Sequence, residues 1–414
     1  MRIIHTSDWH LGHHLFGLSR EFEQQQFLDF LFLQLQQTKA DALIVAGDLF
    51  DTANPPAWAW RLLYQFLAKV KQQLPQLDLV LVAGNHDSPS KLDAPDHLLK
   101  AFDIHLVGGL PRLSDNTLDF DKLIIPLTNS DGDIAARVAA VPFLRPGDLD
   151  LASIEECDDK LIAGVERVYQ QIADRLHALN KPEQASIAVA HAYLVSSTIS
   201  EMSERRILGG NQHALPLEIF ANNYDYTALG HLHKPQQLGG LSVYYSGSPI
   251  PLSLAERDYK HQIKLVEFSG RNLKQVSTIL VPRSVDMLCV PKEAQSLNNV
   301  LELLQALPEE AVEPHLQPLL EVKILLDEPQ AMLRDKINQS LEGKAVRLVK
   351  ITTQYKEQNK IPLAFDGKKL DQLQPEEVFS LKYQQQYGEQ PPQPYVDAFA
   401  RLLSDTHSTE STTD

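Results

Sequence analysis

The chain has 414 residues, of which 43% are apolar, so it can bury a substantial core and divide into two or three domains. Its formal net charge of −16 gives no sign of the basic face that nucleic-acid-binding proteins usually carry. The cysteines, Cys157 and Cys289, lie outside any CxxC spacing, which argues against disulfides and thiolate metal sites and favours a reducing, cytoplasmic setting. No signal-peptide core and no sufficiently long apolar run is present, so we expect neither secretion nor membrane anchoring.

The first hundred residues alternate short β-rich runs with helical periodicity. The runs are RIIHTSD, a helix over 20–38, ALIVAGD, a helix over 56–74, and LVLVAGNHD. This βαβαβ order predicts a parallel, buried sheet. Each strand stops on polar residues, and open α/β sheets bind ligands at the carboxyl ends of their strands. We therefore expect these polar clusters to be neighbours.

The middle of the chain continues with strands and one long helix. Strand-like segments between 110 and 143 flank the turn signal NSDGD, and helical periodicity follows over 158–179. Two further strands, in SIAVAHA and DYTALGHLH, again end in polar residues. We assign residues 1–280 to this first domain.

After about residue 281 the pattern restarts as a compact βαβαβ unit, with Ser296 as the expected N-cap of its first helix. We assign 281–370 to this smaller domain and 371–405 to a helical segment formed by PEEVFSLKYQQQY and PYVDAFARLL. The second of these helices has apolar residues at helical spacing, and that face either packs on its own domain or binds a partner: Tyr395, Val396, Phe399, Leu402 and Leu403. We expect the polar tail 406–414 to be disordered.

Five strand ends carry side chains that can bind a metal or transfer a proton: Asp8, His10, Asp48, Asp51, Asn85, His86, Asp87, His191, His231 and His233. Oxygen and imidazole donors without thiolate suit Mn²⁺, Fe²⁺ or Zn²⁺, and they outnumber what one ion needs. Two metals about 3.5–4 Å apart that share a carboxylate can bind a phosphate and activate water for in-line attack at phosphorus. The arrangement therefore favours phosphoester hydrolysis.

Each of these residues taken alone has an ordinary structural interpretation. Asp8 could cap a helix, Asn85 could sit in a turn, and His191 could be a hydrogen-bonded core histidine. Together, in this order and each after an apolar strand, they favour the dinuclear site. Gly47, Gly84 and other glycines precede the candidate ligands, as expected where the backbone turns sharply or approaches a ligand closely.

The ordered motifs DxH, GDxxD, GNHD, a later isolated His and GHxH resemble the signature of calcineurin-like metallophosphoesterases. Within that superfamily, the stretches HTSDWHLG, LIVAGDLFD, AGNHDSP, YDYTALGHLHKPQ and SGSPIPLSLAE resemble the SbcD family of bacterial nuclease subunits. The resemblance implies an α/β fold: a metallophosphoesterase β-sandwich flanked by helices, a small α/β capping domain, and C-terminal partner-docking helices.

The resemblance also implies the ligand sets of two divalent ions, expected to be Mn²⁺. One ion would be held by Asp8, His10, Asp48 and His233, and the other by Asp48, Asn85, His191 and His231. Asp48 would bridge both ions, which needs an ionised carboxylate with two usable oxygens. Asn85 would supply a neutral oxygen that limits the negative charge at the second ion.

In the family pattern His86 is not a metal ligand, and the resemblance implies that it protonates the leaving oxygen or stabilises the transition state, with Asp87 orienting it. Asp51 has either an acid-base or positioning role, or a purely structural one. We treat the other histidines as structural or surface residues, including His5, His13, His14, His105, His213 and His261.

The function that the resemblance implies is a DNA nuclease in repair and recombination, with 3′–5′ exonuclease action on duplex ends and endonuclease action at hairpins. It implies an SMC-like ATPase partner of the SbcC type, and a dimer within a heterotetramer. The acidic chain would then owe much of its DNA affinity to the partner, and candidate phosphate contacts are Arg205, Arg206, Lys234 and Arg257.

Two alternatives remain. The same ligands would serve a phosphatase or small-molecule phosphodiesterase, although the capping and docking segments count against it. A silent scaffold subunit would typically have lost a ligand or His86, and none is missing from the sequence.

Overall fold

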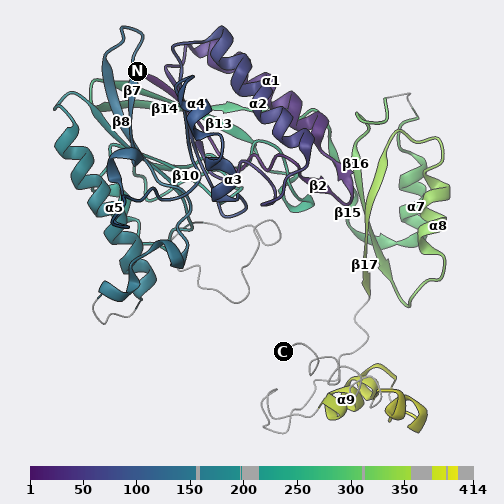
Figure 1. Ribbon diagram of the computed structural model, residues 1–414. Coiled ribbons are helices and arrows are strands. Elements are labelled where there is room, and N and C mark those ends of the chain that lie inside the picture. The colour runs from purple at the N-terminus through teal and green to yellow at the C-terminus, as the bar shows by residue number, and fades with distance from the viewer. Residues whose placement is uncertain are drawn as a thin grey trace.

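The computed structural model describes residues 1–154, 159–195, 197, 214–309, 313–355, 375–387 and 390–399. Within this part of the chain, two six-stranded sheets pack face to face in the N-terminal portion (Figure 1). The first sheet has the order β14-β13-β1-β4-β5-β6, formed by β1 (Arg2–Thr6), β4 (Ala42–Ala46), β5 (Asp78–Val82), β6 (Ile104–Val107), β13 (Gln262–Ser269) and β14 (Asn272–Leu280). The second has the order β11-β12-β10-β9-β8-β7, formed by β7 (Ile124–Thr128), β8 (Ile134–Ala140), β9 (Ala185–His191), β10 (Tyr226–Gly230), β11 (Gln236–Gln237) and β12 (Val243–Tyr245).

The centre of each sheet is parallel, as predicted, and antiparallel strands lie at one edge of the first sheet and at both edges of the second. β1, β4, β5 and β6 run parallel, as do β8, β9, β10 and β12. Apolar side chains from both sheets fill the space between them, including Ile44, Val82, Val138 and Ile187. Burial on both faces explains why these strands read as continuous apolar runs.

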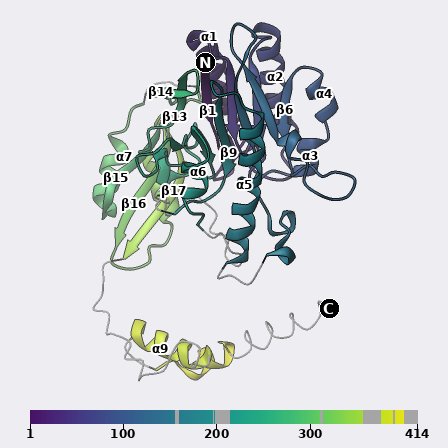
Figure 2. The same ribbon diagram turned by 90° about the vertical axis from the view of Figure 1, so that its left-hand side faces the viewer.

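Helices cover the outer faces of the two sheets. α1 (Glu21–Thr38) and α2 (Ala57–Gln73) lie on the first sheet, and α5 (Lys160–Leu179) lies on the second (Figures 1 and 2). The predicted helices over 20–38, 56–74 and 158–179 are confirmed to within two residues at each end. α5 begins where the Asp159 carboxylate accepts the backbone N–H groups of Leu161 and Ile162.

A hairpin that the sequence patterns do not predict extends the first sheet. β13 pairs antiparallel with β1 and with β14, and Gly270 turns between the two strands of the hairpin with φ +57°. The hairpin returns the chain to the first sheet and leads directly into the linker before residue 287. It therefore connects the first sheet of the sandwich to the C-terminal part of the chain.

Residues 287–355 form a separate three-stranded parallel sheet with two helices, here called the C-terminal α/β unit. It consists of β15 (Met287–Ser296), α7 (Leu297–Gln305), β16 (Leu319–Leu326), α8 (Leu333–Ser340) and β17 (Arg347–Tyr355), in the strand order β15-β16-β17. This confirms the predicted βαβαβ pattern. Both helices cover the face turned away from the sandwich (Figure 1). Ser296 occupies the N-cap position of α7, but its side chain makes no capping hydrogen bond.

A small apolar cluster joins the C-terminal α/β unit to the sandwich. Leu15 and Leu254 of the sandwich pack with Val285, Met287 and Leu319. The sandwich and the unit therefore share a small apolar core, and they lie side by side in both orientations of the ribbon (Figures 1 and 2).

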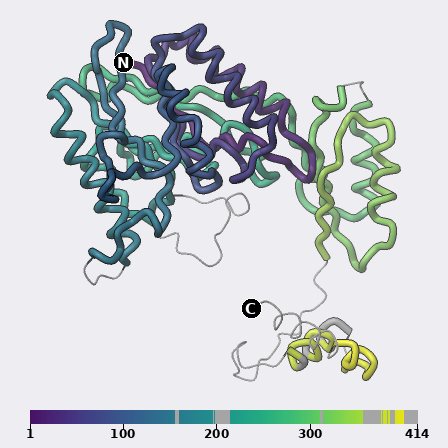
Figure 3. The backbone as a smooth tube through the Cα atoms, viewed as in Figure 1, coloured from purple at the N-terminus to yellow at the C-terminus, as the bar shows by residue number. Residues whose placement is uncertain are grey.

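The last described residues form two short helices, α9 (Pro375–Tyr387) and residues 393–399. Both lie apart from the sandwich and from the C-terminal α/β unit (Figure 3). Phe399 stacks on Phe379 with ring centroids 4.4 Å apart, and Tyr395 contacts Tyr383 at 5.8 Å. The apolar face predicted for the second helix thus packs at least in part on α9. The tail 406–414 lies outside the described residues, and none of the described helices is long and apolar enough to cross a bilayer.

Candidate metal centre

The polar residues at the five strand ends meet at one edge of the sandwich. Asp8 and His10 follow β1, Asp48 follows β4, Asn85 follows β5, His191 ends β9, and His231 and His233 follow β10. Ligand atoms lie within 4.8 Å of one another in three groups: Asp8, His10 and His233; His10, Asp48 and His86; and Asp8, Asp48 and His191. The expectation that separate clusters become neighbours is confirmed.

Asp48 occupies the middle of the site. Its Oδ2 lies 3.4 Å from His10 Nε2 and 3.3 Å from His191 Nε2, so a single oxygen faces one imidazole from each predicted ligand set. Its Oδ1 accepts the backbone N–H of His86 at 2.9 Å. The oxygen available to both sides is therefore Oδ2, whereas Oδ1 is held by the backbone.

The second side of the site converges on Asn85. Its Oδ1 lies 3.0 Å from His191 Nε2 and 3.1 Å from His231 Nδ1. The rings of His191 and His231 are 5.2 Å apart, and those of His10 and His233 on the opposite side are 5.1 Å apart. Asp8 connects the sides, because its Oδ1 accepts the backbone N–H of His231 at 2.9 Å.

Oxygen atoms fix the tautomers of three candidate ligands. His10 Nδ1 donates to Asp51 Oδ1 (3.2 Å), His191 Nδ1 to the Ala46 carbonyl (2.9 Å), and His233 Nδ1 to Glu256 Oε1 (3.0 Å). An imidazole that donates from Nδ1 presents the lone pair of Nε2 to a metal, and such outer hydrogen bonds usually accompany metal-binding histidines.

The donor set fits a divalent metal ion. His10 Nε2 is buried without a hydrogen-bond partner among the described residues, which is unfavourable unless another species binds it. Burial lowers the pKa of His10, and burial with the nearby His191 lowers the pKa of His231 to about 3, so both rings are neutral as ligands must be. Burial opposes ionisation of Asp48, but His191 and His10 outweigh it and hold the pKa of Asp48 well below its usual range.

The buried carboxylates of Asp8 and Asp48 also need a nearby positive charge. Burial lowers the pKa of His191, yet the charges of Asp48 and Asp8 and the Asp48 hydrogen bond raise it to about 9. The protonated ring thus supplies the positive charge that the two buried carboxylates need. A metal ion would supply the same charge and displace the Nε2 proton.

The backbone of the site is held in uncommon conformations. Asp8, His10, Asp48 and His231 all have positive φ, at 54°, 46°, 49° and 99°. Such conformations are unfavourable for non-glycine residues and tend to collect at functional sites. A Cβ at Gly84 would lie 2.1 Å from Asp48 Oδ1 and 2.3 Å from its backbone nitrogen, which confirms the close approach expected at this glycine.

Two family models match the chain. Residues 1–235 match the model described as calcineurin-like phosphoesterase, and residues 283–387 match the one described as type 5 capsule protein repressor C-terminal domain. The SbcD component of the nuclease SbcCD from Rhodobacter capsulatus is 37% identical over 389 residues, covering 92% of this chain and 94% of that protein. The chain belongs to the SbcD family of calcineurin-like phosphoesterases. The SbcD components of the SbcCD nucleases of Escherichia coli K12 (33% identity, 92% of each chain) and Bacillus subtilis (34% identity, 64% of this chain and 66% of that protein) are similar to it as well.

The SbcD-family site corrects the predicted relation between His86 and Asp87. The Asp87 carboxylate accepts the backbone N–H groups of Gly84, Leu49 and Phe50 at 2.9–3.0 Å and holds the loops that carry the ligands. His86 Nδ1 instead donates to the backbone carbonyl of Asp51 at 2.7 Å. Burial and the Asp48 charge raise the pKa of Asp87 to about 6. The expectation that Asp87 orients His86 is therefore wrong, because its oxygens are used by three amides.

Asp51 lies beside the site and positions imidazoles. Its carboxylate accepts from His10 Nδ1 at 3.2 Å and from His13 Nδ1 at 3.1 Å. Burial alone would raise the pKa of Asp51, but the hydrogen bonds from these two rings outweigh it and lower the pKa. The positioning role allowed for Asp51 is the one these contacts support. His13 also contacts the Leu252 carbonyl at 2.9 Å, so it supports the site rather than only the surface.

Two further residues of this SbcD-family site escaped prediction. Glu256 is buried against His233. Arg145 donates to the Asp87 carbonyl at 3.1 Å. The Arg145 guanidinium also lies 5.4 Å from the Phe143 ring, and that ring contacts His191. Glu256 lies in SGSPIPLSLAE, a stretch already singled out as family-like. Arg145 has no motif that could have revealed it.

The candidate phosphate contacts fare differently. Arg257 is paired with Glu321 of the C-terminal α/β unit at 2.7 Å, and its contact with phosphate stays a prediction. Lys234 directly follows His233 and is partly exposed. Arg205, Arg206 and His213 lie outside the described residues. Among the histidines set aside, the buried His5 and His261 bond to neighbouring protein atoms and lie outside the groups of candidate ligands.

Proposed function

We propose that this chain is the nuclease subunit of a DNA-processing complex and hydrolyses phosphodiester bonds at duplex ends in the 3′–5′ sense and at hairpins. The observation that carries this proposal is the position of Asp48 Oδ2 between His10 Nε2 and His191 Nε2, at 3.4 and 3.3 Å. The relatives named as SbcD components of SbcCD nucleases, which match along 92% of the chain, support the choice of DNA as substrate.

The centre takes two divalent ions, with Mn²⁺ as the preferred metal. Asp8, His10, Asp48 and His233 hold one ion, and Asp48, Asn85, His191 and His231 hold the other. When bound, such a pair polarises the phosphate and supplies a hydroxide nucleophile at neutral pH. The neutral Asn85 oxygen and the single shared carboxylate keep the negative charge of the donor set low, so that the centre attracts an anionic phosphodiester.

His86 is the residue that moves a proton. Its Nδ1 donates to the Asp51 carbonyl at 2.7 Å, which fixes the ring, and its ring lies 4.8 Å from that of His10. When the ring is doubly protonated, Nε2 of His86 can give its proton to the leaving oxygen, or donate a hydrogen bond to the charge that develops on the phosphate. Asp51 and Asp87 act through backbone and imidazole contacts that hold the loops in place.

The partner is an SMC-like ATPase of the SbcC type, and the working assembly is a heterotetramer with two copies of each protein in the cytoplasm. Residues 281–370 form a capping domain beside the site, and the helices within 371–405 bind the ATPase. A partner accounts for DNA binding by a chain with a net charge of −16, since phosphate binding otherwise rests on a few local cations such as Arg145 and Lys234.

The test uses the purified chain with Mn²⁺, with and without its ATPase partner, on duplex ends, DNA hairpins and a generic aryl phosphodiester. We expect DNA cleavage that the partner stimulates. Cleavage of the aryl ester alone would favour the small-molecule phosphodiesterase, and inactivity on every substrate would favour the silent scaffold.

A further inference from the structure

A tight turn at residues 253–257 supports the metal centre from behind. Glu256 in this turn is completely buried, and its carboxylate accepts from His233 Nδ1 at 3.0 Å, from Ser248 Oγ at 3.2 Å and from the Leu252 backbone N–H at 3.0 Å. Burial opposes ionisation of Glu256, but the charge and hydrogen bond of His233 bring its pKa down to about 2. The carboxylate therefore holds the His233 ring in one orientation and makes its Nε2 lone pair a stronger metal ligand.

The next residue of this turn faces the C-terminal α/β unit. Arg257 Nη1 donates to Glu321 Oε2 on β16 at 2.7 Å, and Thr352 Oγ1 on β17 donates to Glu321 Oε1 at 2.9 Å. The Arg257 carbonyl accepts from Arg283 Nη2, in the linker between β14 and β15, at 2.5 Å. Arg257 is thus bound to the unit through its side chain and to the linker through its backbone.

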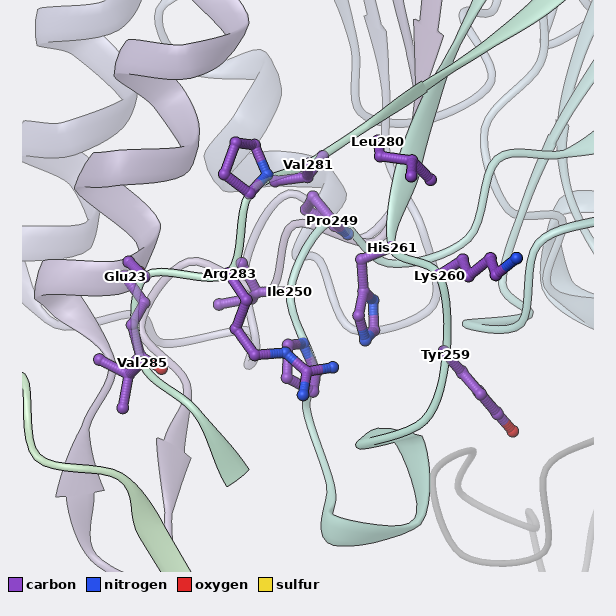
Figure 4. A pocket seen from close by; sticks show the side chains of 13 residues that line it. Glu23, Pro249, Ile250, Tyr259, Lys260, His261, Leu280, Val281, Arg283 and Val285 are labelled. Carbon is purple, nitrogen blue, oxygen red and sulfur yellow. The ribbon is translucent and has the colours of Figure 1, made fainter. Parts of the chain in front are cut away.

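The packing around the turn is incomplete on the linker side. A cavity of about 210 Å³ lies between residues 249–251, residues 259–261, the last residue of β14 and the linker residues 281–285. Figure 4 shows Arg283 and Val285 of the linker across from Tyr259, Lys260 and His261. Close-packed neighbours normally fix the position of a segment. Because packing is incomplete beside the turn 253–257, its position depends more on its hydrogen bonds and on the Arg257–Glu321 ion pair.

We propose that Glu256 is a positioning residue for the metal ligand His233, and that the Arg257–Glu321 pair couples the metal centre to the placement of the C-terminal α/β unit. When the unit moves, Glu321 shifts Arg257 through their ion pair. Glu256, the neighbouring residue, then shifts as well and changes the orientation of the His233 ring through their hydrogen bond. The affinity for the ion at Asp8, His10 and His233 then depends on where the unit sits. This inference rests on the proposed function, because it takes His233 as a metal ligand.

The test is a calorimetric titration of the metal-free protein with Mn²⁺. Glu256→Gln should weaken the ion on the His233 side by about 10- to 100-fold, the usual effect of removing a carboxylate behind a metal-binding imidazole. Glu321→Gln, which lies outside the centre, should weaken the same ion by roughly two- to thirtyfold. The matched control is Glu309→Gln, which removes a charge from another 2.7 Å ion pair of the unit, with Lys344, and should leave both affinities unchanged.

A double-mutant cycle and a spectroscopic signal separate positioning from general destabilisation. In the Glu256→Gln background, Glu321→Gln should have no further effect on Mn²⁺ affinity, because the connection is already broken. Both single variants should change the visible absorption of bound Co²⁺, and thermal unfolding in EDTA checks that each variant is folded. Normal metal binding by Glu256→Gln or by Glu321→Gln, or additive effects in the cycle, would overturn the inference alone. Wild-type protein that binds no metal would instead contradict the proposed function.

Discussion

Asp48 is the residue on which the two halves of the site depend, because its Oδ2 faces both His10 and His191. Replacing it by asparagine leaves a similar shape but removes the shared negative charge. We predict that Asp48→Asn binds fewer than one Mn²⁺ per chain where the wild type binds two, as measured by elemental analysis after dialysis. Retention of one fully occupied ion would show that the carboxylate serves only one side.

His86 and His231 should separate chemistry from metal binding. His86 is held by the Asp51 carbonyl, and His231 Nδ1 lies 3.1 Å from Asn85 Oδ1 within the second ligand set. We predict that His86→Ala keeps both ions and loses about 10²–10⁴-fold in cleavage rate, the usual contribution of a proton donor. His231→Ala should lose one ion. Metal content unaltered by His231→Ala would disprove the ligand assignment.

His5 predicts a pH dependence of stability that is independent of the metal ligands. Burial, with a smaller effect of the Lys264 charge, lowers its pKa to about 3, and its ring bonds to the Tyr226 hydroxyl at 2.9 Å and the Leu229 carbonyl at 3.2 Å. Because the folded state resists a proton that the unfolded chain accepts near pH 6.5, stability falls as the pH drops from 6.5 towards 3. At pH 5 the loss is about 2 kcal/mol.

The variant His5→Asn should remove this part of the pH dependence. In EDTA, the free energy of urea-induced unfolding should fall about 2 kcal/mol less between pH 7.5 and pH 5 in the variant than in the wild type. Equal pH dependence in both proteins would mean that the buried ring takes up its proton as readily as it does in the unfolded chain.

At the scale of elements, the start of α1 is tied to the loop before Glu256 by a buried ion pair. Arg20 donates to both Glu23 oxygens at 2.6 Å and to the Pro251 carbonyl at 2.8 Å. Removing the cation strands a buried carboxylate, so Arg20→Met should lower the free energy of unfolding by about 3–5 kcal/mol. The paired change Arg20→Met with Glu23→Leu should cost less. An equal or larger loss in the double variant would contradict this account of the pair.

The sequence predicts helices and strands well where a helix has one buried face or a strand is buried on both faces. Helices α1, α2 and α5 and the strands ahead of the ligands were predictable, since amphipathic helices and strands buried on both faces leave strong apolar patterns. The β13–β14 hairpin escaped because its strands alternate less clearly: β14 is partly exposed along its length at a sheet edge. Ser296 shows a different limit, because a favourable N-cap residue need not make its side-chain hydrogen bond.

At the scale of the whole molecule, the ligands were predictable but their supports were not. Ligands lie in short motifs at strand ends, and the fold brings those ends together. The groups behind them come from distant segments: Glu256 is 23 residues from His233, and Asp51 is 41 residues from His10. Asp87 was misassigned because adjacency to His86 in sequence does not show that three backbone amides use its carboxylate.

The arrangement of the whole molecule also relates the metal centre to the C-terminal α/β unit. The unit shares an apolar cluster with the sandwich and holds Arg257 through Glu321, while Glu256 next to it holds His233. None of these contacts could be read from sequence, because the apolar cluster and the Arg257–Glu321 pair depend on how the two parts of the chain dock, and the Glu256–His233 contact depends on how the loop after β12 folds against the site.

The central claim is a pair of divalent ions on either side of Asp48 Oδ2, and anomalous diffraction from Mn²⁺-loaded crystals tests it most directly. We predict two anomalous peaks about 3.5–4 Å apart, one beside His10 and His233 and the other beside His191 and His231. A single peak, or a second peak away from Asp48, would contradict the account.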